Sequence, residues 1–517
     1  MLAQTPGPDA ASRPMDHALA ELKTRLAEVS DLGRAARLLA WDQQVMMPRA
    51  GAAARAEHLA TLGRLAHERF VDDAVGRLLE RLRAHEERLP PDSDDASLIR
   101  VARRDWEKER RVPADLRADL LRAAATAQPA WVEARAESSF ARFRPFLARN
   151  LELKLRYVEC FEPADEPYDL LLDDYEEGMT TAEVRGVFAR LKAELPHLVR
   201  ETADVAEGPG QQLAGPFPVE RQREVVASLL GQLGFDSSGW RLDVAAHPFA
   251  TALSSSDVRL TTRYGERDLS AVFASMHEYG HGLYEEGVDP ELDRTPLGSG
   301  VSLGLHESQS RLYENLVGRS RPFWRRFFPE LTAAFPDALR GMDAEGFYRA
   351  VNRVRPSLIR VEADEVTYSL HVILRFELEQ ELIEGRLRLD DLPAAWNARM
   401  DEYLGVEVPD DAHGVLQDIH WAGGTFGYFP TYALGNVMSV QIWEAARAEL
   451  PELEEQIEAG ELGDLREWLR DRLHRHGRKF TPKETLARVV GGAIDPEPYL
   501  RYLRDKVTDV YGLAEAR

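Results

Sequence analysis

The chain is poor in cysteine and has no long apolar run, and both absences exclude classes of protein. Cys160 is the only cysteine among 517 residues, so an intramolecular disulfide is excluded. No stretch approaches the roughly 18 uninterrupted apolar residues of a membrane span. The N-terminus is polar and lacks the apolar segment of a secretion signal. These absences predict a cytoplasmic protein without a membrane span.

Basic residues are too few to balance the acidic ones, and this excludes two classes of partner. The chain holds 65 Lys and Arg residues against 88 Asp and Glu, so its formal net charge is −23. Nucleic acids and anionic membranes are negatively charged and would be repelled, so neither is expected as a principal partner. The hydrophobic share of 44% is that of a globular protein.

Low-complexity linkers and internal repeats are also missing, although the length would suffice for several domains. Apolar positions recur at three- and four-residue spacing through most of the chain, which predicts helices. Residues 239–268, and a second segment near 357–366, instead show the pattern of short strands. We therefore predict a mainly α protein. A disordered N-terminus over 1–15 precedes one domain over 16–513 with two lobes, a deep central groove and a small antiparallel β-sheet.

The segment after the predicted sheet contains His277-Glu278-Tyr279-Gly280-His281 within a helical pattern. Positions i and i+4 lie on the same face of an α-helix, so both imidazoles reach one ion. Glu278 is then placed to act on a water molecule beside the ion and not to bind the ion. Such a motif also occurs without a metal, so a third ligand is needed before it indicates a hydrolase.

Glu307 is the candidate third ligand. It follows His281 by 26 residues and lies in the first turns of a second helical pattern, SLGLHESQSRLYENLVGR. Two histidines and one carboxylate leave a coordination position of Zn²⁺ open, which is the catalytic arrangement. The alternative for Glu307 is a solvated carboxylate paired with Arg311 at i+4. His306 is an alternative ligand, but we favour a supporting or packed position for it.

Two further groups of residues have both a structural and a functional interpretation. Asp257, Arg259 and Thr261 alternate along a predicted strand and share one face, either as an edge-strand ion pair or as a wall of the cleft. Arg360 lies among acidic residues and forms either a structural ion pair or a bidentate contact to a substrate carboxylate.

Residues 414–432 are too polar and too rich in glycine for a core segment, and ordered loops of this kind concentrate functional groups. A histidine or tyrosine here is suited to donate a hydrogen bond to a developing oxyanion. The alternative is aromatic packing between helices, which we weigh equally for Tyr432. The candidates in this stretch are Gln417, Asp418, His420, Trp421, Tyr428 and Tyr432.

These motifs together resemble the Taq-type metallocarboxypeptidases, a helical family of His-Glu-x-x-His peptidases of the gluzincin type. Five separated stretches carry the resemblance, in order along the chain: 247–264, 276–287, 297–315, 359–379 and 414–436. Residues 39–62 and 499–513 also look like the family's, so the likeness spans nearly all of 16–513. A minor departure is Tyr313, where the family often has tryptophan.

The resemblance implies release of single residues from peptide C-termini, with broad side-chain tolerance and poor handling of C-terminal proline. It implies that His277, His281 and Glu307 bind the metal and that Glu278 is the base. It assigns Arg360 to the substrate carboxylate, and it also implies a homodimer. Further substrate-binding candidates are Asp257, Arg259, Thr261, Gln417 and Tyr432.

The mechanistic hypothesis is hydrolysis assisted by one Zn²⁺ ion per chain, although the same ligands accept Co²⁺. Glu278 acts as the general base, and His420 and Tyr428 stabilise the oxyanion, with Tyr432 second to Tyr428. The nearest alternative is an oligopeptidase or dipeptidyl carboxypeptidase on the same site. An alternative from another class is a non-catalytic, zinc-stabilised interaction protein, which would have no need of Glu278.

Overall fold

The computed structural model of the chain describes residues 8–203, 205 and 213–513. The helices that precede the sheet are α1 (Pro8–Val45), α2 (Ala52–Phe70), α3 (Asp73–Glu86), α4 (Asp94–Arg111), α5 (Ala114–Ala136), α6 (Phe140–Val158), α7 (Pro167–Leu172), α8 (Thr181–Ala203) and α9 (Val219–Gln232). The strands are β1 (Trp240–Val244), β2 (Ala250–Ser254) and β3 (Asp257–Thr262).

The remainder of the chain returns to helices, as the apolar spacing predicts. These are α10 (Ser270–Gly287), α11 (Leu303–Arg311), α12 (Arg321–Ala334), α13 (Ala344–Val351), α14 (Tyr368–Ile383), α15 (Leu392–Leu404), α16 (Pro430–Glu449), α17 (Leu453–Ala459), α18 (Gly463–Arg472), α19 (Pro482–Val490) and α20 (Glu497–Tyr511). The short 3₁₀ turns are η1 (Arg49–Gly51), η2 (Pro290–Leu292), η4 (Arg360–Glu362), η5 (Leu389–Asp391) and η6 (His474–His476), and η3 (Leu312–Val317) is a π-helical turn. The prediction of a mainly helical protein is confirmed.

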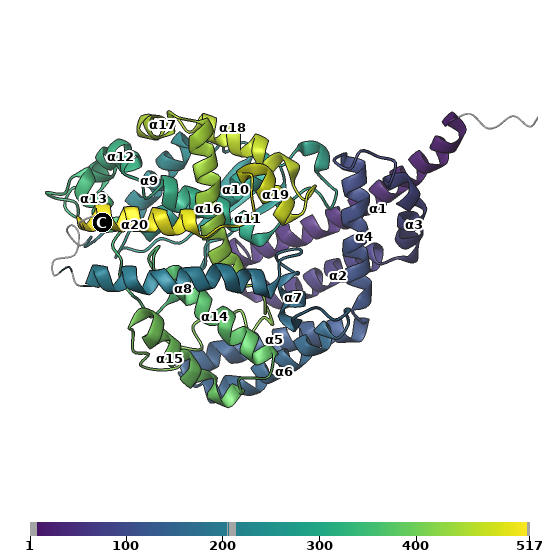
Figure 1. Cartoon of the computed structure of the whole chain (residues 1–517), viewed down its shortest axis with the longest axis horizontal. Coiled ribbons are helices and arrows are strands. Elements are labelled where there is room, and N and C mark those ends of the chain that lie inside the picture. The colour runs from purple at the N-terminus through teal and green to yellow at the C-terminus, as the bar shows by residue number, and fades with distance from the viewer. Residues whose placement is uncertain (1–7, 204, 206–212, 514–517) are drawn as a thin grey trace, which may run out of the picture.

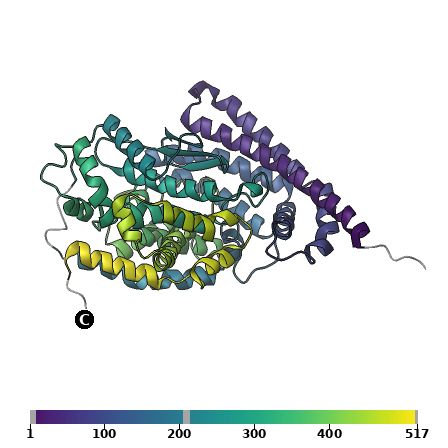
Figure 2. The same cartoon turned by 90° about the horizontal axis from the view of Figure 1, so that it is seen from above.

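The N-terminal helices α1 and α2 pack against each other and extend along one side of the molecule (Figures 1 and 2). α1 begins at Pro8, inside the segment 1–15 predicted to be disordered, while residues 1–7 lie outside the described part of the chain. Proline is tolerated in a first helical turn because its missing N–H would have no partner there. None of the described helices combines the length and apolarity that crossing a bilayer requires.

The sheet has three strands in the order β1-β3-β2, and it is mixed, not wholly antiparallel. β2 and β3 form an antiparallel pair joined by the short turn at Ser255 and Ser256, and β1 pairs with β3 in parallel. The strands read as antiparallel in sequence because alternating burial is the same for both directions of pairing. The second expected strand, near 357–366, is instead the 3₁₀ turn η4 with flanking irregular backbone.

The largest hydrophobic core cluster contains buried residues from Ala127 to Val507 and includes the sheet and the helices around it. A smaller cluster joins α1, α3 and α4 to Val288, Leu292 and Leu297. The sheet packs on α10, as expected for a sheet beside the active site.

α11 packs against both α10 and α16. The contact of α11 with α16 depends on Gly435, because a Cβ at this position would lie 2.6 Å from the Cβ of Glu307. Glycine therefore allows the backbone of α16 to approach the candidate metal ligand closely.

Candidate active site

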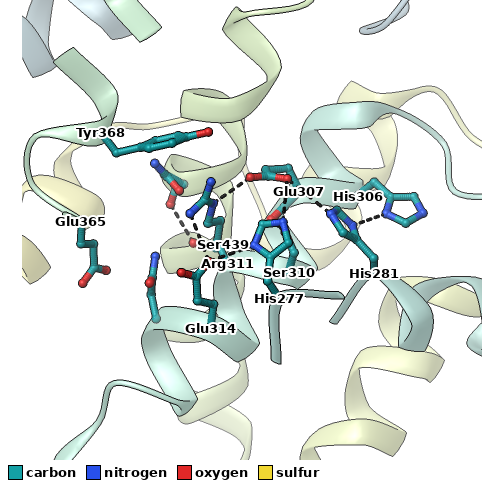
Figure 3. A network of polar contacts seen from close by, with 12 residues as sticks. His277, His281, His306, Glu307, Ser310, Arg311, Glu314, Glu365, Tyr368 and Ser439 are labelled. Carbon is teal, nitrogen blue, oxygen red and sulfur yellow. Dashed lines mark hydrogen bonds and ion pairs between the residues drawn. The ribbon is translucent and has the colours of Figure 1, made fainter. Parts of the chain in front are cut away.

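His277 and His281 lie one turn apart on α10 and face Glu307 on α11 (Figure 3). The Nε2 atoms of His277 and His281 lie 3.6 and 3.5 Å from Oε2 of Glu307. One ligand atom from each of these residues lies within 4.8 Å of the others. The structure thus brings together the three ligands predicted from the sequence, which fit one metal ion with an open position.

The other ring nitrogen of each histidine is held by a side chain outside this ligand set. Nδ1 of His277 lies 2.9 Å from Oε2 of Glu314, and Nδ1 of His281 lies 2.6 Å from Nδ1 of His306. Nε2 of His306 in turn lies 2.8 Å from Glu285. Donation outward from both Nδ1 atoms leaves both Nε2 lone pairs free for a metal, which is the usual support of ligating imidazoles. His306 therefore supports a ligand histidine, as we favoured.

Local structure at both ends of α11 fixes Glu307. The Ser302 hydroxyl accepts the N–H of Leu305 at 3.2 Å, and the buried carboxylate of Glu176 accepts the N–H of Gly304. After Arg311 the chain continues as the π-helical turn η3, which carries Glu314 toward His277. π-Helical turns occur frequently at functional sites.

Glu307 is 5% exposed, which excludes the solvated carboxylate as its interpretation. The predicted i+4 contact with Arg311 is nevertheless present, with Nε of Arg311 donating to Oε1 at 2.7 Å. Burial alone would raise the pKa of Glu307, but Arg311 and the two histidines hold it well below its usual range. The carboxylate is therefore ionised and available to a cation.

Glu278 is buried beside the ligand histidines, with 6% of its surface exposed. Burial raises its pKa to about 7, and the nearby Glu307 carboxylate contributes in the same direction. A carboxylate that gains and loses a proton near neutral pH has the property that a general base and acid requires.

Arg360 lies in the turn η4 and is fixed by buried ionic contacts. Its Nε and one terminal nitrogen donate to Oδ1 of Asp418 at 3.1 and 2.7 Å, and the other terminal nitrogen donates to the Tyr368 hydroxyl at 2.9 Å. Arg375 also donates to Asp418, at 2.6 Å. Burial alone would raise the pKa of Asp418, but the two arginines hold it far below its usual range. Three of the five N–H groups of Arg360 are thus used, and two are left for another acceptor.

Residues 414–429, here called the aromatic loop, bring His420 and Tyr428 beside Tyr432 on α16. Nε2 of His420 lies 3.1 Å from the Tyr432 hydroxyl, and the rings of Tyr428 and Tyr432 are 5.2 Å apart. Burial lowers the pKa of His420 to about 4, so its ring is neutral at pH 7. The Arg360 guanidinium lies 4.8 Å from the Tyr432 ring centroid, which joins this cluster to the candidate carboxylate site.

Gln417 connects the aromatic loop to the segment that carries Arg360. Its Oε1 accepts the backbone N–H of Arg360 at 2.9 Å, and its amide nitrogen donates to the carbonyls of Leu358 and His413. Both amide N–H groups are thus used by backbone carbonyls, so Gln417 fixes the backbone of Arg360.

The strand β3 places Asp257, Arg259 and Thr261 in a different setting. Arg259 donates to both carboxylate oxygens of Asp257, at 2.9 and 3.0 Å, and lies 4.5 Å from the ring centroid of Trp41. Thr261 is fully buried and exchanges hydrogen bonds with the backbone of Phe249. Among the described residues no hydrogen bond or ion pair joins these three to His277, His281 or Glu307. The ion-pair interpretation of this strand is the one that the contacts favour.

Several residues of the site were not singled out in the sequence. Glu314 lies seven residues after Glu307, two helical turns along the same face, and this spacing was a usable signal. Charged residues within the otherwise apolar helix α14 were a second signal, since a charge in such a helix needs a buried partner. The residues missed are Glu285, Glu314 and Arg375.

A large helical fold with an open His-His-Glu metal site and an adjacent glutamate defines a metallopeptidase of the His-Glu-x-x-His class. The family model "Carboxypeptidase Taq (M32) metallopeptidase" matches residues 21–507. The chain belongs to this family and is a metal-dependent peptide hydrolase that releases C-terminal residues. The family resemblance stated from the sequence motifs is confirmed.

Individual relatives match over nearly their full length. Thermostable carboxypeptidase 1 of Thermus thermophilus is 43% identical over 505 residues, which are 96% of this chain and 98% of that protein. Carboxypeptidase 1 of Bacillus subtilis is 36% identical over 489 residues, 94% of this chain and 97% of that protein. The M32 carboxypeptidase from Deinococcus radiodurans R1 has a similar crystal structure, with a TM-score of 0.92 and 41% identity over 96% of this chain and 100% of that one.

Proposed function

We propose that the protein releases single amino acids from peptide C-termini, with broad side-chain tolerance and poor action on C-terminal proline. One observation carries the hydrolytic part of this proposal: two imidazoles and a carboxylate converge beside the buried carboxyl group of Glu278. Action at a C-terminus is supported by Arg360, whose two remaining N–H groups are suited to a free carboxylate.

His277, His281 and Glu307 would hold one Zn²⁺ ion per chain, and the same nitrogen and oxygen ligands also accept Co²⁺. When bound, the ion supplies a Lewis acid that polarises the scissile carbonyl and lowers the pKa of water. The fit is supported by Glu314 and His306, which orient both Nε2 atoms toward Glu307.

Proton transfer is assigned to Glu278, which takes a proton from the attacking water and delivers it to the leaving amine. His420 and Tyr428 donate hydrogen bonds to the oxyanion that forms at the scissile carbonyl, and Tyr432 is the second tyrosine candidate. Burial raises the pKa of Tyr428, so its hydroxyl keeps its proton at neutral pH.

Arg360 binds the substrate carboxylate in this proposal, and Arg259 is the reserve candidate. Asp257, Thr261, Gln417 and Tyr432 stay predicted substrate-binding residues. A homodimer, a cytoplasmic location and a single domain over 16–513 also stay predictions.

Product analysis tests the proposal. A peptide with a free C-terminus, incubated with the Zn²⁺-loaded and the Co²⁺-loaded protein, should yield single amino acids in order from its C-terminus. The same peptide with an amidated C-terminus should react far more slowly, and a chelator should abolish both reactions. Release of dipeptides or internal fragments would instead favour a dipeptidyl carboxypeptidase or an oligopeptidase.

A further inference from the structure

Glu379 on α14 is a fully buried carboxylate that the proposed mechanism does not use. Its Oε1 accepts the indole N–H of Trp421 at 2.7 Å. Its Oε2 accepts the Tyr168 hydroxyl at 2.7 Å and the backbone N–H of Gly427 at 3.0 Å. Three donors from α7 and the aromatic loop thus meet one carboxylate.

The two loop donors flank the residues that act on the substrate. Trp421 directly follows His420, and Gly427 directly precedes Tyr428. Gly427 has a positive φ of 88°, and a Cβ at this position would lie 2.6 Å from the backbone of Leu171. The loop backbone therefore has little freedom at the point where Glu379 binds it, and a shift at this carboxylate moves both His420 and Tyr428.

Arg375 lies one turn before Glu379 on the same helix and binds Asp418, which lies two residues before His420 in the same loop. α14 thus holds the aromatic loop through two side chains one turn apart, Arg375 at Asp418 and the carboxyl group of Glu379 at Trp421 and Gly427. Removing a carboxylate from water is costly, and an apolar side chain would fill this space without that cost. Only an acceptor without N–H groups matches three converging donors.

We propose that Glu379 is a positioning residue for catalysis, which holds His420 and Tyr428 where they donate hydrogen bonds to the oxyanion. This role rests on the proposed function of those two side chains. The variant that tests it is Glu379→Gln, which keeps the size of the side chain but turns an amide N–H toward donors that are already present. The expected result is a loss of about 10- to 100-fold in kcat, because small displacements of catalytic groups have effects of this size.

We also expect the KM of Glu379→Gln to change by less than about threefold. Its metal content should stay at one ion per chain. The matched control is Glu381→Gln, the same change on the same helix, where the carboxylate binds Arg399 at 2.7 Å near the surface. Its kcat should stay within about twofold of the unmodified protein.

If Glu379→Gln does not fold, Tyr168→Phe removes one donor and leaves the carboxylate in place. This variant should lower kcat several-fold with the same KM and metal content.

Double variants separate this role from the proposed function. The combined loss for Glu379→Gln and His420→Ala should be smaller than the product of the single losses, because Glu379 acts in part through His420. Multiplied losses, a lowered metal content, or an unchanged kcat in Glu379→Gln while His420→Ala is slow would overturn the role of Glu379. If His420→Ala and Tyr428→Phe both keep full kcat, the oxyanion assignment is wrong instead.

Discussion

The metal centre and the aromatic loop achieve order by different means. The ligands His277, His281 and Glu307 stand on two regular helices, and hydrogen bonds within α10 fix the spacing of its two histidines. His420 and Tyr428 stand on irregular backbone. Two buried side chains of α14, Arg375 and Glu379, bind this backbone segment through Asp418, Trp421 and Gly427. The comparison teaches that two regular helices place the metal ligands, with support from Glu176, Glu314 and Gly435. The proposed oxyanion donors instead depend on how α14 packs against an irregular loop. Four variants test this division.

Glu278→Gln should have the largest effect, because it removes the proposed general base. We expect kcat to fall by about 10³-fold or more, while the protein still binds one metal ion per chain. Metal analysis and kinetics on one short peptide measure both quantities. The exposed Glu291→Gln serves as the control. If the Glu278 variant retained turnover, Glu278 would not be the general base.

Arg360→Ala should have the next largest effect, and it belongs to the substrate side of the comparison. Loss of a charge-assisted contact to a free carboxylate should lower kcat/KM by about 100-fold for a peptide with a free C-terminus. For an amidated peptide the change should be much smaller, and metal content should not change. The control is Arg355→Ala, an exposed arginine five residues earlier. Equal losses on both peptides would show that Arg360 has no role in carboxylate binding.

Glu314→Gln should weaken metal binding by about 10-fold or more, because it removes the negative charge beside Nδ1 of His277. Competition with a chromogenic chelator measures the affinity. Excess metal should restore kcat to that of the unmodified protein, which distinguishes weak binding from a damaged site. A loss that excess metal does not restore would place Glu314 in the substrate reaction and break the division between the two regions.

Arg259→Gln should have the smallest effect. Its ion pair with Asp257, whose side chain is 39% exposed, is expected to contribute about 1 kcal/mol or less to stability. Activity on a free C-terminus should change by less than about threefold. A rise in KM as large as that of Arg360→Ala would make Arg259 the carboxylate anchor.

The two regions also differ in how far the sequence predicted them. The i, i+4 spacing of His277 and His281 is a property of any α-helix, so it predicted their convergence without knowledge of the fold. The distance to Glu307 allowed a second helix alongside, and α11 lies there. The direction of β1 relative to β3 was wrong in the prediction, because alternation does not encode it.

The contacts around Arg360 and the aromatic loop could not be predicted from local sequence patterns. Residue types marked Arg360, Asp418 and His420 as candidates, but no spacing indicated that Asp418 binds both Arg360 and Arg375. Likewise, Glu379 lies 42 residues before Trp421 in the chain. Pairing over such separations depends on how α14 packs against the loop.

The sequence by itself determined three features of this protein: a mainly helical chain, a metal site of two histidines and a glutamate, and a further glutamate, Glu278, beside them. Helical periodicity, the i, i+4 spacing of the histidines and the residue types indicate these features, so they can be predicted from the sequence. Only the tertiary structure decided which side chains position the metal ligands and the residues of the aromatic loop. Glu314, His306, Arg375 and Glu379 acquire their partners through packing, and packing brings together groups that the chain keeps apart.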